Sequence, residues 1–205
     1  MELNISTDMR NIEKVVDNVH KRQIPFAAHR AINKTAFDVQ REEKRLMPRQ
    51  IDRPKPYTKK GIIVKRSKNK RHLEGSVIFD RYYAVSVVKG ATENPRNGKY
   101  LRTPTSLAKK DKYGNVTRAT MRKMLKDKKN HFSGTPRGRK GKGLLGIWSR
   151  TKGNRAIKQV IRFEETRRRP KRLDFYKIAD DKAKEVFSRH FSEQLEVAIA
   201  NSKRR

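Results

Sequence analysis

The sequence predicts an α+β fold in which a kinked N-terminal helical region and a long C-terminal helix pack on a mostly antiparallel β-sheet with extended basic loops. Two observations lead to this prediction. Apolar residues recur every three or four positions in residues 1–47 and 173–202, which is the period of an amphipathic helix. Short runs of Val, Ile and Tyr, bounded by Gly and Pro, occupy residues 48–172 and indicate strands. We take residues 1–205 as a single domain.

Charge is concentrated in the middle of the chain. The sequence has 54 Lys and Arg against 21 Asp and Glu, a formal net charge of +33. Residues 1–47 hold nine basic and seven acidic residues and residues 173–202 hold four and six, whereas residues 48–172 hold 38 and eight. Self-repulsion of this size disfavours an isolated compact monomer, so we expect an anionic partner or a counter-charged neighbouring subunit.

Composition also excludes several classes of protein. Hydrophobic residues make up 34% and charged residues 37%, so we expect a small core with part of the chain in loops or arms. There is no cysteine, which excludes disulfides and thiolate zinc sites and suits a reducing cytoplasm. The polar beginning of the sequence and its short apolar runs predict neither a classical signal peptide nor a membrane span.

Two helices are predicted before residue 48. Thr7 or Asp8 caps the first, which runs to about Arg22 on a stripe of apolar residues. The Ile24-Pro25 pair then breaks or kinks the path, and Pro25 suits the first turn of a second helix. Small apolar residues continue this helix to about residue 46, and Pro48 is expected to end it.

The next segment predicts strands and turns. Residues 49–60 read as an extended connection because of two prolines. Residues 61–66, 74–80 and 82–89 are rich in Val, Ile and Tyr and predict three antiparallel strands, with residues 67–71 at a hairpin tip. Turn signals in residues 90–115 exclude long regular elements.

The second half predicts a short helix, a hairpin and a long helix. Residues 117–129 indicate a basic helix that buries Ala119, Met121, Met124 and Leu125 along one edge. Residues 133–143 read as a mobile glycine-rich loop. Residues 143–150 and 155–165 form a strand pair around the turn at 152–154 and close the sheet. The last helix runs from Asp174 to about residue 202.

Two basic segments are the candidate contact sites. In the glycine-rich loop, a Walker phosphate motif fails because Pro136 and Gly143 occupy required positions, yet the loop can follow a phosphate backbone or become ordered against a neighbouring subunit. Residues 167–172 can bind DNA phosphates or acidic residues of an adjacent ring, or form a solvated linker. The candidate nucleic-acid or acidic-partner contacts are Arg137, Arg139, Lys140, Lys142, Arg167, Arg168, Arg169, Lys171 and Arg172.

Other residue types indicate packing rather than chemistry. The five histidines are scattered without metal-ligand spacing, and adjacent acidic pairs such as Glu42-Glu43 point about 100° apart on a helix. We therefore expect no catalytic, metal or cofactor site, so the chain is not expected to be an enzyme. Aromatic residues beside basic ones could stack on bases, but packing is favoured. Oligomer or packing contacts are expected at Phe175, Ile178, Val186, Phe187, Phe191 and Leu195.

The order of these parts resembles the minor tail protein Z family of lambda-like phages and prophages. The resemblance covers nearly the whole chain, although the basic insertion at about 105–143 varies within the family. Its motifs concern packing and turns, not catalysis. They are the residues 24–28 leading to 31–36, the Arg102-Thr103-Pro104 and 112–115 elements, and residues 175–179 at the start of the last helix.

The resemblance implies a tail-completion fold that assembles as a ring, a hexamer or a dodecamer, at the head-proximal end of the tail. There it would join the tail tube to the head–tail connector or adaptor proteins around viral double-stranded DNA. The expected location is the virion neck, after assembly in the cytoplasm of the bacterial host. The alternative is a basic nucleic-acid-binding protein such as a ribosomal RNA binder. A nuclease is disfavoured because no carboxylate or histidine cluster has metal-ligand spacing.

Overall fold

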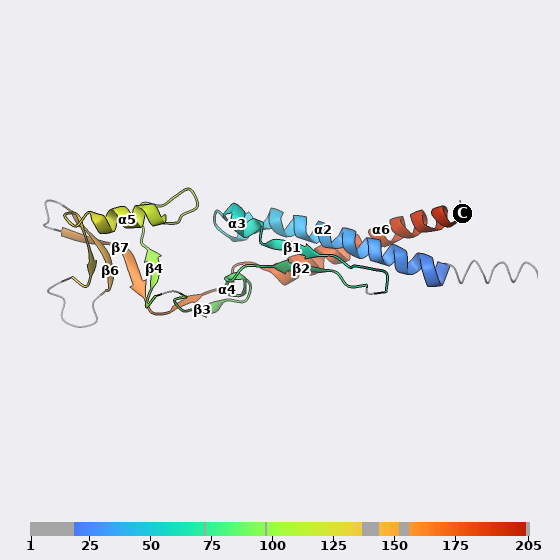
Figure 1. Cartoon of the computed structure of the whole chain (residues 1–205), viewed down its shortest axis with the longest axis horizontal. Coiled ribbons are helices and arrows are strands. Elements are labelled where there is room, and N and C mark those ends of the chain that lie inside the picture. The colour runs from blue at the N-terminus through green and yellow to red at the C-terminus, as the bar shows by residue number, and fades with distance from the viewer. Residues whose placement is uncertain (1–18, 72, 97, 137–143, 152–155, 204–205) are drawn as a thin grey trace, which may run out of the picture. The chain divides into compact units, whose positions relative to one another are not determined.

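The structure is a computed structural model, and it describes residues 19–71, 73–96, 98–136, 144–151 and 156–203 (Figure 1). The fold is α+β, with long helices near both ends of the described chain and antiparallel strands between them. The chain forms two compact units. Unit 1 comprises residues 1–49, 56–82 and 174–205, and unit 2 comprises residues 50–55 and 83–173. The single domain expected from the sequence stays a prediction.

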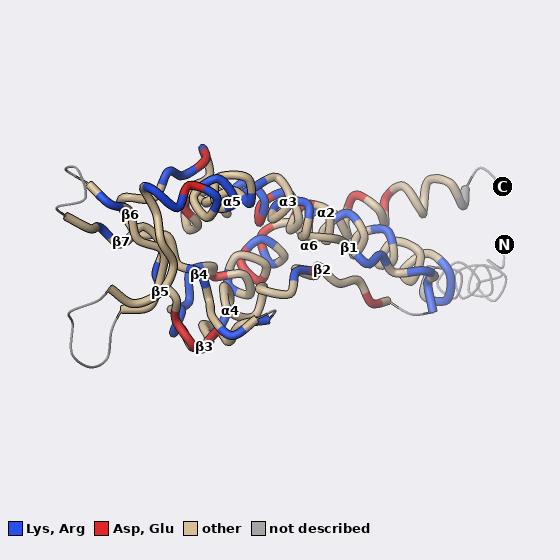
Figure 2. The backbone as a smooth tube through the Cα atoms, turned by 60° about the vertical axis from the view of Figure 1, so that its left-hand side comes forward, with Lys and Arg blue, Asp and Glu red and all other residues tan. Residues whose placement is uncertain are grey.

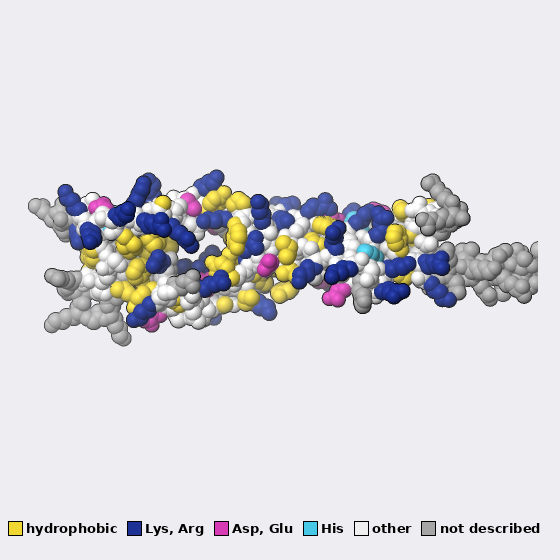
Figure 3. Space-filling model, viewed as in Figure 1, with side chains coloured by type: hydrophobic (Ala, Val, Ile, Leu, Met, Phe, Trp, Pro, Cys, Tyr) yellow, Lys and Arg dark blue, Asp and Glu magenta, His cyan; other side chains and the backbone are white. Residues whose placement is uncertain are grey.

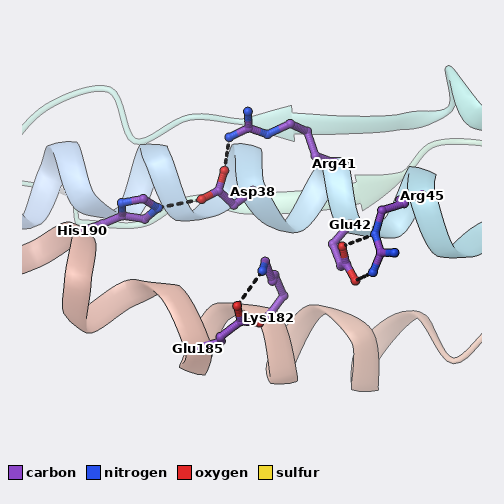
Figure 4. A network of polar contacts seen from close by, with 7 residues as sticks. All are labelled: Asp38, Arg41, Glu42, Arg45, Lys182, Glu185 and His190. Atoms are coloured by element: carbon purple, nitrogen blue, oxygen red, sulfur yellow. Dashed lines mark hydrogen bonds and ion pairs between the residues drawn. The ribbon is translucent and has the colours of Figure 1, made fainter.

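Unit 1 is built on two long helices that lie side by side. Helix α2 (Ile24–Gln50) follows a π-helical turn, η1 (Val19–Gln23), and helix α6 (Phe175–Lys203) is the last element. Lys34 pairs with Glu193 and Asp38 with His190, so rising numbers on α2 meet falling numbers on α6 and the helices are antiparallel. Figure 4 shows this arrangement around Asp38 and His190. The predicted last helix is therefore confirmed.

The start of α2 agrees with the sequence, but its end does not. Pro25 lies in the first turn of α2, directly after the π-helical turn η1, so the proline without an N–H stands where the helical hydrogen-bond pattern changes. Pro48 was expected to end the helix, and this is wrong because α2 continues to Gln50. Only two residues follow Pro48, so the lost bond to the carbonyl four positions earlier affects only the last turn. The first predicted helix, at residues 8–22, lies mostly outside the described residues.

A hairpin packs on α2 within unit 1. Strands β1 (Ile62–Lys65) and β2 (Ser76–Phe79) are antiparallel, with Ile62 opposite Phe79. Two side chains of α2 bond to hairpin backbone: Gln40 Nε2 donates to the Ile62 carbonyl at 2.6 Å, and Asn33 accepts from the Ser67 N–H at 2.8 Å. These two strands are confirmed. The predicted extended segment 49–60 instead contains a short helix, α3 (Pro56–Lys59).

The core of unit 1 includes polar residues as well as apolar ones. Ala27, Ala31 and Val39 of α2 are buried with Val186 and Ala198 of α6. On the same helices, four polar side chains are also buried. They are Thr35, Glu43, His190 and Gln194. The helical periodicity in the sequence included Thr35 in the packed stripe of the second helix but not Glu43, His190 and Gln194.

Unit 2 is a four-stranded antiparallel sheet in the order β4-β7-β6-β5 (Figure 1). The strands are β4 (Leu101–Pro104), β5 (His131–Gly134), β6 (Gly146–Thr151) and β7 (Ala156–Glu164). The β6–β7 pairing confirms the predicted strand pair, and a bulge lies between Ile147 and Trp148. The predicted turn at 152–154 lies outside the described residues.

Helix α5 (Arg118–Lys126) covers the apolar centre of this unit. Ala108, Ile147, Val160 and Ile161 are buried together, and Met121 and Met124 pack against them beside Val116 and Phe163. This confirms the predicted short helix, and of its four expected buried positions Met121 and Met124 are partly buried. Ala119 and Leu125 are exposed, because they lie off the Met121–Met124 side of the helix.

A second, two-stranded sheet of unit 2 differs from the prediction. Residues 82–89 were expected to form a strand, but Ala84–Val88 form helix α4. Strand β3 (Ala91–Glu93) pairs antiparallel with β8 (Arg167–Arg169), a strand not predicted from an arginine run. With β1–β2, the described strands thus divide among three antiparallel sheets. Among the helices the structure describes, none is both long and apolar enough to cross a bilayer.

Candidate polyanion-binding surface

Most of the excess positive charge belongs to unit 2. By sequence, unit 2 contains 29 basic and six acidic residues, whereas unit 1 contains 25 and 15. Figure 2 shows Lys and Arg along much of α5 and the segments next to it. The candidate surface therefore lies in unit 2, among cations that no acidic side chain neutralises.

The arginine tract at 167–172 is only partly available for a partner. Arg167 Nη1 donates to Thr103 Oγ1 at 3.3 Å, and Arg169 Nε lies 2.5 Å from Glu93 Oε2 on the paired strand β3. Both side chains are half-buried, because alternate residues of a strand share one face. Arg168, between them, is exposed. The structure thus assigns Arg167 and Arg169 to holding β8 in place.

The rest of the tract joins β8 to α6. Lys171 and Arg172 are exposed, and the Arg172 N–H donates to the Val87 carbonyl at 2.9 Å. The positive charge of Arg172 also helps to hold the pKa of Asp52 below its usual range, after the larger effect of the hydrogen bond from Arg53. Arg168, Lys171 and Arg172 therefore present side chains on the surface of unit 2.

The glycine-rich loop lies mostly outside the described residues. Arg137, Arg139, Lys140 and Lys142 are all in this part, so their candidate roles stay predictions. The start of the loop is fixed, since Trp148 Nε1 donates to the Gly134 carbonyl at 3.1 Å. The predicted loop therefore begins later than expected, because residues 131–134 form strand β5.

In the described part of unit 2, helix α5 carries four exposed cations that form no ion pair with a described acidic side chain. Its side chains Arg118, Arg122, Lys123 and Lys126 are exposed, and we call these four residues the α5 face. Met121 and Met124 hold the opposite side of the helix against the core. Thr117 begins the helix, and its hydroxyl accepts from the Thr120 N–H at 3.1 Å. The sequence indicated a basic helix here but did not single out these residues as a site.

The turn after α5 is braced by Arg150, a half-buried residue of strand β6. Arg150 Nη1 donates to the carbonyls of Lys128, Lys129 and His131 at 2.9, 3.0 and 3.3 Å. Asp127 accepts hydrogen bonds from the backbone and side chain of Asn130, and these bonds hold the pKa of Asp127 below its usual range. The exposed side chains of Lys128 and Lys129 therefore extend from a fixed turn.

A second turn near α5 is fixed in a similar way. Asp111 Oδ1 accepts from the N–H groups of Asn115 and Tyr113 at 2.8 and 2.9 Å, and Lys55 Nζ lies 3.7 Å from its other oxygen. These contacts, led by the one from Asn115, lower the pKa of Asp111. The exposed lysines of this turn are Lys109, Lys110 and Lys112.

The packing expected of the aromatic residues holds for Trp148 and Tyr100 of unit 2, whereas Tyr57 and Tyr82 of unit 1 are 57% and 72% exposed. Trp148 is buried and stacks on Phe132, with ring centroids 6.5 Å apart. Tyr100 stacks on Phe163 at 6.1 Å. In the part of unit 2 that the structure describes, the exposed large hydrophobic side chains are aliphatic. They are Val85, Leu107, Leu125, Leu144 and Ile157. No exposed aromatic platform for bases exists among these described residues.

The apolar stripe of α6 divides into two rows. Phe175, Ile178 and Val186 are buried in unit 1. Phe187 is 40% exposed and its ring stacks on Phe191, 6.2 Å away, while Phe191 and Leu195 are half-buried. The first row therefore packs within the chain, and only the second has area left for another molecule.

Polar clusters in the described residues do not form a metal centre. No group of three His, Asp or Glu side chains there could hold a metal ion. His190 bonds to Asp38, His131 lies 3.5 Å from Asp127, and His29 is near Asn33. Glu43 is fully buried, and burial, aided by the charge of Glu42, raises its pKa to about 8. Comparison with family models, with curated proteins and with solved structures finds no match to the chain.

Proposed function

We propose that this chain is a structural protein of the neck of a tailed bacteriophage. In this proposal it is a tail-completion, or tail-terminator-like, subunit that forms a ring and joins the tail to the head connector around the DNA channel. Its location would be the virion, and its partners would be copies of itself, connector or adaptor proteins, tail tube proteins and viral double-stranded DNA. The resemblance to the minor tail protein Z family supports this reading.

The observation that carries the proposal is the separation of charge between the two units. Unit 1 has a helical framework in which many charges are paired, as in the Asp38–Arg41 and Glu42–Arg45 contacts. Unit 2 has a small apolar core and a surface dominated by cations. Several copies in a ring would bring these cations together, and only DNA or acidic neighbours could offset their repulsion.

The half-exposed row on α6 adds support for self-association. Phe187 and Phe191 place two stacked rings beside the surface of unit 1. Aromatic side chains are enriched at the centres of protein interfaces, where they exclude water over a large area. In the proposed ring, this row is the contact between neighbouring copies.

Imaging of particles tests the proposal. Particles made without this protein should appear as separate heads and tails in negative stain, and expression of the wild-type chain should restore joined particles. Mass spectrometry of purified wild-type particles should detect a few copies of the chain in each. Normal infectious particles that lack the protein would overturn the neck role and favour the RNA-binding alternative, which crosslinking to RNA would then examine.

A further inference from the structure

We propose that the α5 face, together with Lys128 and Lys129, binds the phosphate backbone of duplex DNA. This deepens the proposed function, because it assigns one surface to the DNA contact. The choice of DNA over RNA rests on the proposed function. The inference that the ligand is a phosphate backbone rests only on the geometry and charge of α5.

The cationic side chains of α5 point away from the core of unit 2. Met121 and Met124 pack against the core of unit 2, so the opposite side of α5 faces outward. Arg118, Arg122 and Lys126 follow one another at four-residue intervals, which places them in a row with a rise of about 6 Å per step. Duplex DNA carries a phosphate about every 3.4 Å along each strand. A row of this length therefore faces several phosphates at once.

The cations of this surface are not paired with acidic side chains of the described chain. Among the residues that the structure describes, the four side chains of the α5 face, Lys128 and Lys129 make no ion pair. The acidic groups nearest in sequence are already occupied: Asp111 by Lys55 and backbone N–H groups, and Asp127 by Asn130 and His131. Six like charges on one surface repel one another, and phosphates would relieve that repulsion while releasing counterions.

The backbone of this surface is held in place. Thr117 caps the start of α5, and Arg150 holds the turn after its end by donating to three carbonyl groups. An exposed nine-residue helix would otherwise fray at both ends. Because the backbone is held, the cations lose little conformational freedom when they bind.

The residues of this surface suit a duplex better than a single strand or a protein. Single-stranded nucleic acids are bound by stacking of bases on aromatic side chains, and the described part of unit 2 exposes none. Protein partners generally require an apolar or aromatic centre, but Leu125 is the one large apolar side chain exposed on α5. A surface dominated by cations fits sequence-independent contact with a duplex. Figure 3 shows Lys and Arg side chains gathered over this part of unit 2.

The test is fluorescence anisotropy of the full chain with a labelled DNA duplex of about 20 base pairs over a salt series. The variant replaces the α5 face by glutamine: Arg118→Gln, Arg122→Gln, Lys123→Gln and Lys126→Gln. Glutamine keeps helix propensity and removes charge. We expect the slope of log K against log salt to become shallower by about two to four, since each phosphate contact contributes about 0.9. At about 100 mM salt, binding should weaken roughly 10- to 100-fold.

A matched variant controls for net charge. Arg66→Gln, Lys68→Gln, Lys70→Gln and Arg71→Gln remove two arginines and two lysines from the exposed hairpin connection of unit 1. This control should lose less than about threefold in affinity, with circular dichroism confirming that both variants are folded. Equal losses in the two variants would overturn the proposal, as would tighter α5-dependent binding to single-stranded DNA or to polyglutamate. Such a result leaves the neck role intact, because particle imaging tests that role separately.

Discussion

The Nε2 atom of His190 on α6 lies 2.7 Å from Asp38 Oδ2 on α2, so a largely buried polar contact, with Asp38 half-buried, joins the two long helices of unit 1 (Figure 4). Arg41 bonds to the other carboxylate oxygen. Burial alone would raise the pKa of Asp38, but the hydrogen bonds from His190 and Arg41 outweigh burial and lower it.

Removing either partner should therefore destabilise unit 1. We expect His190→Ala or Asp38→Asn to lower the free energy of unfolding by about 1–3 kcal/mol, with a double variant less destabilised than the sum. Urea denaturation measures this. Lys34→Gln, which breaks a half-exposed ion pair with Glu193, is the control and should cost less than about 1 kcal/mol. Equal effects at both sites would contradict the role of burial.

The same contact has a pH dependence. Because the pKa of Asp38 is lower in the folded chain than the unfolded value of about 4, its contribution to stability is present above pH 4 and is lost as the pH falls through the folded pKa. Asp38→Asn should remove this loss of stability at low pH.

Glu43 should produce the opposite pH dependence. Its pKa is about 8 in the folded chain and near 4.3 in an unfolded one, so its contribution is present at low pH and is lost as the pH rises towards 8. Glu43→Gln should flatten this fall, which we expect to be on the order of 2–4 kcal/mol between pH 5 and pH 8. Glu42→Gln, with its side chain paired to Arg45, is the neighbouring control. A pH profile unchanged by Glu43→Gln would disprove the burial of this carboxyl.

Arg150 should act through hydrogen bonding rather than charge. Lysine keeps the charge, but its side chain is one bond shorter, so its ammonium does not reach the position of Nη1 among the three carbonyls. Arg150→Lys should therefore cost about 1–2 kcal/mol and speed hydrogen exchange in residues 128–131. Arg162→Lys changes an exposed arginine whose ion pair with Glu164 is long, at 3.5 Å, and should have little effect. Matching exchange rates in the Arg150→Lys variant and the wild type would argue against the bracing role.

Adjacent residues on α6 should separate folding from self-association. Val186 is buried, so Val186→Ala should destabilise the chain by about 2 kcal/mol. Phe187 is 40% exposed, so Phe187→Ala should destabilise the chain less than Val186→Ala but weaken self-association several-fold in analytical ultracentrifugation. If Phe187→Ala unfolds the chain without affecting association, the outer row of α6 is not the proposed interface.

The long helices were predictable because their apolar periodicity extends over many turns. The helix at residues 84–88 was not, because Val85, Val87 and Val88 together favour a strand. Local contacts decide otherwise: Ser86 Oγ donates to the Tyr83 carbonyl, and Gly90, with φ of +74°, follows the helix where a left-handed residue commonly ends one. Gly90 could have indicated from the sequence that a helix, rather than a strand, ends here.

The candidate surface was predictable only as a basic region. Which arginines remain exposed depends on strand pairing. An arginine run does not predict a strand, and only the folded chain places Glu93 beside Arg169 and Thr103 beside Arg167. The α5 face could have been found by plotting cations as well as apolar residues at helical spacing. The burial of Glu43 could not have been predicted in this way, because a carboxylate on an amphipathic helix is usually solvated.

The joining of separated particle parts tests the central claim most directly. Heads and tails assembled without this protein would be purified, mixed with the purified wild-type chain, and examined by electron microscopy and plaque counts. The neck proposal predicts that joined, infectious particles form only when the chain is added. Heads and tails that join and infect equally well without it, or that remain separate with it while a wild-type lysate joins them, would contradict the proposal.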